Sequence, residues 1–153
     1  MNRTALGFAA LLVCLGSIAF AGEATKVVLI TSDEARLPAT PTTSLTTRAG
    51  VTRGPKISVS SPNPDAKSVS SPIHFLVKFA ARGGANIDAD SVRIVYLKHP
   101  LVDLTNRLKQ FTKTDGIDAD PVEVPPGTHS FKIDVKDSEG RTSSSVFTFS
   151  VAP

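Results

Sequence analysis

The sequence predicts an all-β protein, an antiparallel β-sandwich of six or seven strands. The first observation is the alternation of apolar and polar residues in several short runs, which gives each run one apolar face. The second is the regular spacing of turn-forming Gly, Pro, Asp and Ser clusters between these runs. The third is that helical spacing of apolar residues is confined to residues 101–111. Together they indicate two sheets around a single thin core.

Residues 1–21 have the features of a secretory signal peptide. Arg3 supplies a positive charge, an apolar run follows over residues 5–18, and a small-residue cleavage signal ends at Ala21. The run is short for a membrane-spanning helix, which needs ~20 residues. We therefore expect an exported protein, periplasmic or secreted, that contacts the membrane only through the signal peptide before cleavage.

The composition of the exported chain argues against a disulfide-dependent fold and against nucleic-acid binding. The single cysteine, Cys14, lies in the predicted signal peptide, so the fold cannot depend on a disulfide even in a compartment that permits one. The formal net charge is +3, the basic residues are scattered, and the chain has one Tyr and no Trp. Without a basic surface carrying aromatic side chains, nucleic acid is not an expected partner.

Residues 22–55 are predicted to form a mostly disordered linker rich in Thr and Pro. From residue 31 onward this segment contains too little apolar surface to offset the entropy lost on ordering. Residues 26–30 are the exception, because their β-favouring run could add an edge strand to the domain. The folded domain is expected over residues 56–153.

The strands of this domain are predicted from alternating apolar positions. The predicted inward-facing sets are Ile57 and Val59; Ile73, Phe75, Val77 and Phe79; Val92, Ile94 and Tyr96; Val122 and Val124; Phe131, Ile133 and Val135; and Phe147, Phe149 and Val151. Turn chemistry separates these sets, most clearly at residues 61–65, 125–127 and 137–140.

Residues 101–111 interrupt the strand pattern. Leu104, Leu108 and Phe111 are spaced by four and three residues, which suits one or two helical turns. A second interpretation makes residues 107–114 a strand, and the sequence leaves both open.

Four segments carry motifs of a known domain family. They are Ile57-Ser58-Val59-Ser60-Ser61-Pro62, Pro72-Ile73-His74-Phe75, Pro125-Pro126-Gly127-Thr128-His129 and Asp137-Ser138-Glu139-Gly140-Arg141-Thr142-Ser143. With these motifs, residues 55–152 resemble a bacterial immunoglobulin-like domain of the fibronectin III-like kind found in exported proteins. The resemblance implies an Ig-like sandwich that serves as a spacer, adhesive module or protein-interaction module, a choice that the fold does not make. The chain departs from antibody-type domains because it has no cysteine pair and no core Trp.

The segment Ile-Asp-Ala-Asp occurs twice, at residues 87–90 and 117–120. If residues 101–116 make one crossing of the sandwich, both copies lie in loops at the same end as the last hairpin, which carries Glu139. Ca²⁺ binds six to eight oxygens, and carboxylates from three loops could supply them. The candidate calcium ligands are Asp88, Asp90, Asp118, Asp120 and Asp137. The favoured alternative is turn chemistry, in which Asp side chains bond nearby backbone N–H groups and each Ile packs inward.

The three histidines are predicted to lie at the opposite end of the sandwich. His74, His99 and His129 could together bind Cu²⁺ or Zn²⁺. Their strand phase argues against this, because His74 should face solvent whereas His129 shares the inward phase of Phe131. Separate surface and rim histidines are the favoured interpretation, and we expect no cofactor.

No arrangement in the sequence predicts an enzyme. No Gly-x-Ser-x-Gly elbow surrounds any serine, and the exported chain has no thiol nucleophile. Leu76, Val95 and Leu97 lie on the outward phase of their strands and are the candidate interaction surface, with strand addition at a sheet edge as another route. We therefore predict a non-catalytic exported module that contacts another envelope protein or acts as a structural or adhesive element. The alternative function is a periplasmic carrier of a metal or small ligand.

Overall fold

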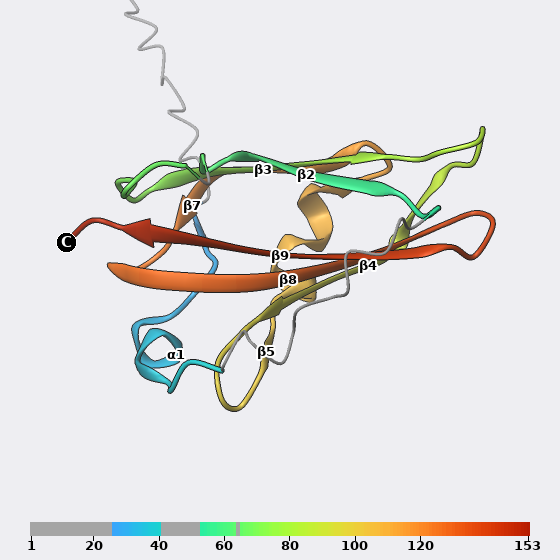
Figure 1. The fold of residues 1–153 in the computed structure, drawn as a ribbon. Coiled ribbons are helices and arrows are strands. Elements are labelled where there is room, and N and C mark those ends of the chain that lie inside the picture. Colours follow the sequence, from blue (N-terminus) through green and yellow to red (C-terminus); the bar gives the residue numbers. More distant parts are fainter. Residues whose placement is uncertain (1–25, 41–52, 64) are drawn as a thin grey trace, which may run out of the picture.

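The computed structural model describes residues 26–40, 53–63 and 65–153, and Figure 1 shows them as two sheets packed face to face. The predicted all-β sandwich is confirmed, with six strands of six or more residues and three strands of two residues in the described part. The predicted signal peptide and residues 41–52 of the predicted linker lie outside the described residues. Among the described helices, none is long and apolar enough to cross a membrane.

The first sheet has the strand order β1-β7-β3-β2, with β6 also paired to β7. Its strands are β1 (Val27–Val28), β2 (Lys56–Ser61), β3 (Ile73–Ala80), β6 (Thr112–Lys113) and β7 (Gly116–Glu123). All pairs are antiparallel except β1 with β7, which is parallel. Gly116 is required where β7 begins, because its φ is +153° and a Cβ there would lie 2.0 Å from the backbone oxygen of Val77.

The second sheet has the strand order β5-β4-β8-β9, and all of its pairs are antiparallel. Its strands are β4 (Ile87–Tyr96), β5 (Val102–Asp103), β8 (Gly127–Asp137) and β9 (Thr142–Val151). The β8–β9 pairing is unbroken over its whole length, and the β4–β8 pairing contains one irregularity between Asp88 and Arg93.

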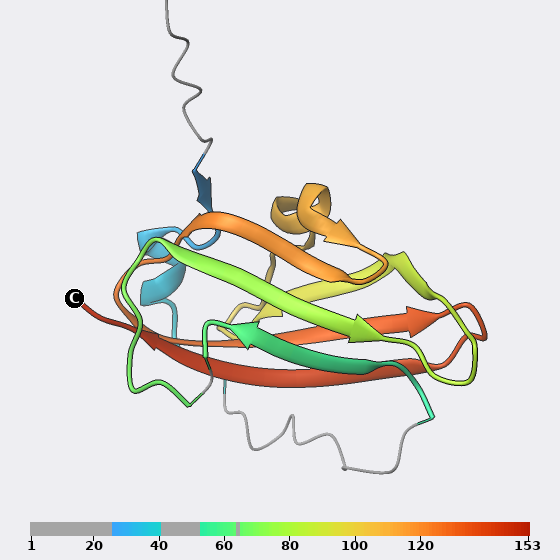
Figure 2. The same cartoon turned by 90° about the horizontal axis from the view of Figure 1, so that it is seen from above.

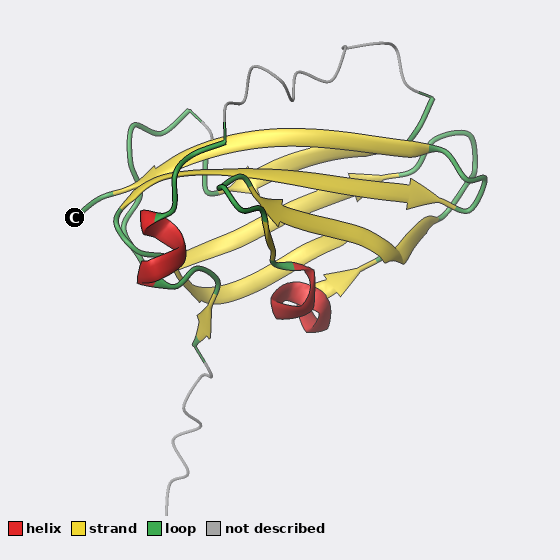
Figure 3. Ribbon diagram, turned by 90° about the horizontal axis from the view of Figure 1, so that it is seen from below, coloured by secondary structure: helices red, strands yellow, loops and turns green. Residues whose placement is uncertain are grey.

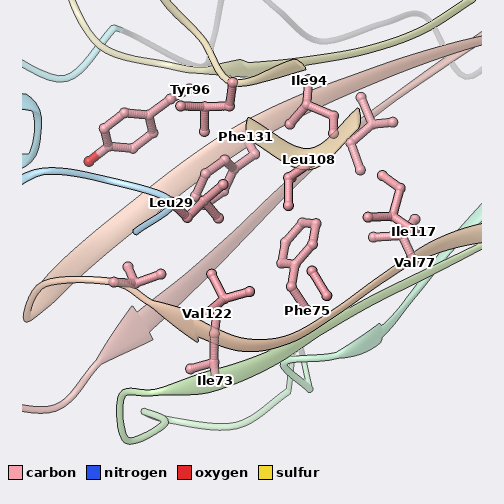
Figure 4. Packing of buried hydrophobic residues seen from close by; sticks show 14 of the residues in the cluster. Leu29, Ile73, Phe75, Val77, Ile94, Tyr96, Leu108, Ile117, Val122 and Phe131 are labelled. Atoms are coloured by element: carbon pink, nitrogen blue, oxygen red, sulfur yellow. The ribbon is translucent and has the colours of Figure 1, made fainter. Parts of the chain in front are cut away.

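The core lies between the sheets and follows the predicted phase. Phe75 and Val77 of β3 are fully buried, as are Phe131 and Ile133 of β8 (Figure 4). Phe131 stacks on Phe149 of the neighbouring strand, with ring centroids 5.5 Å apart. Because alternate residues point to opposite faces of a strand, one apolar set from each sheet is enough to fill this layer.

Within residues 101–111, the short strand β5 comes first and residues 105–111 are helical. Helix α2 (Thr105–Leu108) continues into a 3₁₀ helix (Lys109–Phe111), and only then does the short strand β6 begin. Leu104 and Leu108 are fully buried, so the spacing of four that predicted the helix also places both side chains on the core. The alternative of a strand over residues 107–114 is wrong for its first five residues.

Residues 26–40, hereafter the N-terminal arm, pack against the sandwich although most of them were assigned to the linker. Strand β1 adds to the edge of β7, as its sequence predicted, and Leu29 and Ile30 then enter the core with 0% and 2% of their surface exposed. Helix α1 (Ser32–Arg36) follows and lies at one end of the sandwich (Figures 1 and 3). Two adjacent apolar residues were sufficient to anchor a segment whose overall composition is polar.

Helix α1 begins with a capping box. Thr31 is the N-cap: its hydroxyl accepts from the backbone N–H of Glu34, and the Glu34 carboxylate accepts from the backbone N–H of Thr31. This reciprocal capping box satisfies two of the free N–H groups at the start of the helix. The composition of residues 31–40 resembles that of a linker, but a Thr followed three residues later by a Glu is a sequence signal for the start of a helix.

Candidate functional site

The first Ile-Asp-Ala-Asp copy lies in strand β4 and not in a loop. Asp88 nevertheless makes a turn-like contact, since its carboxylate accepts from the backbone N–H of Asp90 at 3.2 Å. The Ser91 hydroxyl donates to the backbone oxygen of Asp88 at 2.6 Å. These bonds fall where the β4–β8 register shifts between Asp88 and Arg93, so they hold an irregular part of the strand.

The second copy lies within strand β7, so its predicted position in a loop is wrong, and the pairing with β3 shifts register after Ala119. Ile117 and Ala119 are fully buried, whereas Asp118 and Asp120 are exposed on the outer face of the first sheet. The Asp118 carboxylate lies 2.7 Å from Nε2 of His74 on the neighbouring strand. Both carboxylates of this copy therefore face solvent, and the Asp118 carboxylate also forms a cross-strand pair.

Asp137 is fully engaged by the hairpin that joins β8 to β9. Its Oδ1 accepts from the backbone N–H groups of Glu139 and Arg141, and its Oδ2 accepts from Nε of Arg141 at 2.7 Å. Burial opposes ionisation of this carboxyl, but the bonds from Arg141 outweigh it and hold the pKa of Asp137 below its usual range. Its oxygens therefore stabilise the hairpin.

The five candidate calcium ligands do not converge. Asp88 and Asp90 belong to the second sheet, Asp118 and Asp120 project from the outer face of the first, and Asp137 is buried beneath its hairpin. Within the described residues, no group of three or more His, Cys, Asp or Glu side chains is placed to hold a metal ion.

The three histidines are likewise separate. His74 pairs with Asp118 on the outer face of the first sheet, as its phase predicted, and His99 is exposed beyond the end of β4. His129 is 1% exposed and points into the core, also as its phase predicted. The three imidazoles thus face different environments.

His129 has a structural role that its bonds define. Its Nε2 lies 2.8 Å from the backbone oxygen of Pro125, which only accepts, so Nε2 carries the proton. Its Nδ1 therefore accepts from the hydroxyl of Tyr96, also at 2.8 Å. Burial lowers the pKa of His129 and raises that of Tyr96 to about 12, which keeps both groups neutral. The pair fastens β8 to β4 inside the core.

The predicted interaction surface divides between the two sheets. Leu76 lies on the outer face of the first sheet, beside β7, whereas Val95 and Leu97 belong to the outer side of the second. Leu97 is only 2% exposed, so its prediction as an exposed contact residue is corrected: segment 38–40 packs at this point, with the backbone N–H of Thr40 donating to the Leu97 oxygen.

A hollow of about 260 Å³ opens on the outer face of the second sheet, over β4, β5 and β8. Val95 and Leu97 line it together with Leu101, which is 60% exposed and is the most exposed large apolar side chain of the described residues. We call this the β4–β5–β8 hollow. Leu101 was missed because it precedes a two-residue strand and belongs to no alternating run.

Two ion pairs form the rim of the hollow. Arg93 Nε lies 3.3 Å from Asp103 Oδ2, and Lys132 Nζ lies 2.9 Å from the carboxylate of Asp134. The Ser144 hydroxyl donates a further hydrogen bond to Asp134. The Lys132–Asp134 pair has a signal in the sequence, since residues two apart in a strand share a face. The Arg93–Asp103 pair depends on the pairing of β4 with β5.

The two edges of the second sheet are partly covered by the chain itself. At the β4 side, the oxygen of Ile94 accepts from Leu104 N–H and the N–H of Ile94 donates to the Thr105 hydroxyl. At the β9 side, Val69 pairs beside Val151, and Gly54 packs so closely that a Cβ would lie 2.6 Å from the Thr142 oxygen. Strand addition is therefore restricted at both edges.

Comparison with known proteins adds no relative. No family model matches the chain, and neither the curated proteins nor the solved structures include a significant match.

Proposed function

We propose that the chain is an exported, non-catalytic Ig-like module that acts by contact with another protein of the cell envelope. The observation that carries this proposal is the β4–β5–β8 hollow, which exposed Leu101 lines together with Val95 and Leu97. Apolar side chains gathered in a rimmed depression are typical of protein contact sites.

The strand order supports the Ig-like part of the proposal. Strands β2, β3 and β7 share one sheet, and β4, β8 and β9 share the other, with β5 at the edge beside β4. The chain crosses between sheets after β3, after β5 and again after β7, as in Ig-type sandwiches. A buried His129–Tyr96 bond also stands near the position of the tyrosine corner in such domains.

The engagement of the reactive side chains supports the non-catalytic part. Asp137 and Glu34 are each held by an arginine, and His129 is bonded on both ring nitrogens. A general acid or base must be free to reach a substrate proton, and these groups are committed to internal partners.

The test is affinity capture from the envelope fraction by the mature chain and two variants. Leu101→Asp should abolish capture of the partner, because it places an unpaired charge in the hollow. Val28→Asp is the matched control, since Val28 is also a large exposed apolar residue, at 49%, but lies on the first sheet. Both variants should melt close to the unmodified chain. Equal capture by Leu101→Asp and the unmodified chain would refute the proposal.

A further inference from the structure

We propose that the β4–β5–β8 hollow is an anchor pocket for one uncharged, apolar side chain carried on a peptide segment of the partner. This inference rests on the proposed function and specifies what the hollow recognises. The side chains that fit this description are Leu, Ile, Met and Phe.

The size of the hollow favours a single side chain. Its volume of about 260 Å³ lies below the ~300–1,000 Å³ of pockets that hold whole cofactors or drug-sized molecules. Leu97 forms a buried floor, while Val95 and exposed Leu101 form apolar walls. Binding energy at protein interfaces concentrates in such places, where one side chain loses its contact with water.

The charges at the rim offer no unpaired partner to a charged occupant. Arg93 is paired with Asp103, and Lys132 with Asp134, so the four charges balance within the site. A charged side chain entering the hollow would lose hydration against the apolar lining without gaining a free counter-charge, which costs free energy, although separating an exposed rim pair would itself cost little. An apolar side chain does not incur this cost.

The same rim favours a peptide over a simple hydrocarbon. A peptide offers N–H donors and C=O acceptors on both sides of each side chain. Asp103 and Asp134 can accept from such N–H groups, and Arg93 and Lys132 can donate to the carbonyl oxygens. Rim groups of both signs are therefore complementary to the backbone that flanks an anchoring side chain.

Because backbone groups along β4 are already bonded, we expect the partner to contact the hollow through a side chain and not through an added strand. Next to the hollow, Ile94 already bonds to Leu104 and Thr105 through its outward backbone groups. An incoming strand would have to displace these bonds to pair with β4. A side chain inserted from above the sheet leaves them intact.

The test is an NMR titration of the mature chain, labelled at its Leu and Val methyl groups. The ligands are three amino-acid amides, two uncharged and one negatively charged. N-acetyl-L-leucine methylamide should cause saturable shifts of the Val95, Leu97 and Leu101 methyl signals, with a Kd of the order of 1 mM for so small a ligand. N-acetyl-L-alanine methylamide and N-acetyl-L-aspartate methylamide should bind at least about tenfold more weakly, because one underfills the hollow and the other is charged.

A matched pair of variants locates the binding. Val95→Phe fills the hollow without adding charge and should abolish the leucine-amide shifts, whereas Leu76→Phe makes the same kind of change on the other sheet and should leave them. Persistence of the shifts in Val95→Phe, absence of shifts in the unmodified chain, or equal binding of the aspartate amide would each overturn the anchor pocket.

The two proposals fail in different ways. If the leucine amide binds as described but envelope capture is unaffected by Leu101→Asp, the anchor pocket stands and the proposed function is wrong. If capture depends on Leu101 but the aspartate amide binds as well as the leucine amide, the proposed function stands and the anchor specificity is wrong.

Discussion

Each end of the sandwich is fastened by an arginine–carboxylate pair, but the two pairs join very different parts of the chain. At the hairpin end, Arg141 donates to Asp137 at 2.7 Å across four residues. At the arm end, Arg107 donates through both Nη atoms to the Glu34 carboxylate at 2.8 and 2.7 Å, across 73 residues. Figure 2 shows the β8–β9 hairpin and the N-terminal arm at opposite ends of the molecule.

The difference concerns what each pair needs in order to form. The bond between Asp137 and Arg141 forms within the tight turn between two adjacent strands, which local sequence specifies, and Arg141 in addition donates to the Arg82 backbone oxygen at 2.7 Å. The arm pair itself needs helix α2 to be in place, because Arg107 also donates to the Leu29 backbone oxygen at 2.6 Å and so contacts both helix α1 and the residue that follows β1. The Asp137–Arg141 pair therefore depends mainly on local sequence. The bonds from Arg107 to Glu34 and Leu29, which we call the clasp, depend on the tertiary structure.

The largest effect should come from Leu29, the apolar anchor of the arm. Leu29→Ala should destabilise the protein by about 2–5 kcal/mol, because it leaves a cavity between the sheets. Chemical denaturation measures this loss, and Val28→Ala is the neighbouring control on the exposed side of β1, with an expected change within about 0.5 kcal/mol. Equal effects at both positions would mean that the arm does not enter the core.

The next effect should come from breaking the clasp itself. Arg107→Ala removes a forked hydrogen bond to a carboxylate and the donor to the Leu29 oxygen, which should cost about 1–3 kcal/mol. Hydrogen exchange should accelerate in the arm and remain unchanged in the hairpin.

The corresponding variant at the hairpin end should act only locally. Asp137→Asn should accelerate exchange near residues 137–142 and leave the arm protected, and the destabilisations of the two variants should add in the double variant, because the sites are distant and share no partner. Exchange that spreads from one end to the other in either single variant would show that the ends are coupled.

The smallest effect should appear as a dependence on pH. The forked bond from Arg107 lowers the pKa of Glu34 from 4.5 to about 2. The folded protein therefore gains stability from Glu34 above its unfolded pKa of 4.5, and loses it as pH falls toward 2. The melting temperature of the unmodified chain should exceed that of Glu34→Gln at pH 6, and the difference should vanish near pH 2. A constant difference across this range would contradict the clasp.

The strand phases could be predicted because they are properties of short stretches of chain. Alternation placed Phe75 and Phe131 in the core, whereas the spacing of Leu104 and Leu108 suggested a helical turn that the sequence could not separate from a strand. The same reasoning oriented His74 outward and His129 inward. None of these outcomes requires knowledge of which strands become neighbours.

The position and pairing of the two Ile-Asp-Ala-Asp copies could not be predicted from local pattern. Both were expected in loops, yet both lie in strands, and in both the pairing becomes irregular at or beside the second Asp. In β4 the register against β8 shifts between Asp88 and Arg93, whereas in β7 Asp118 and Ala119 are still paired with β3 and the shift falls between Ala119 and Val122. Register is set by the whole sheet.

Periodicity and turn chemistry act over a few residues, so they were enough to predict the two-layer β architecture and the inward face of each long strand, and they left helix or strand open for residues 107–111. The folded molecule was needed to learn that the N-terminal arm joins the core, that Leu97 is buried, and that Leu101 and Val95 line one hollow rimmed by two ion pairs. These features bring together residues far apart in the chain, and their free energy is gained only after the sheets have assembled.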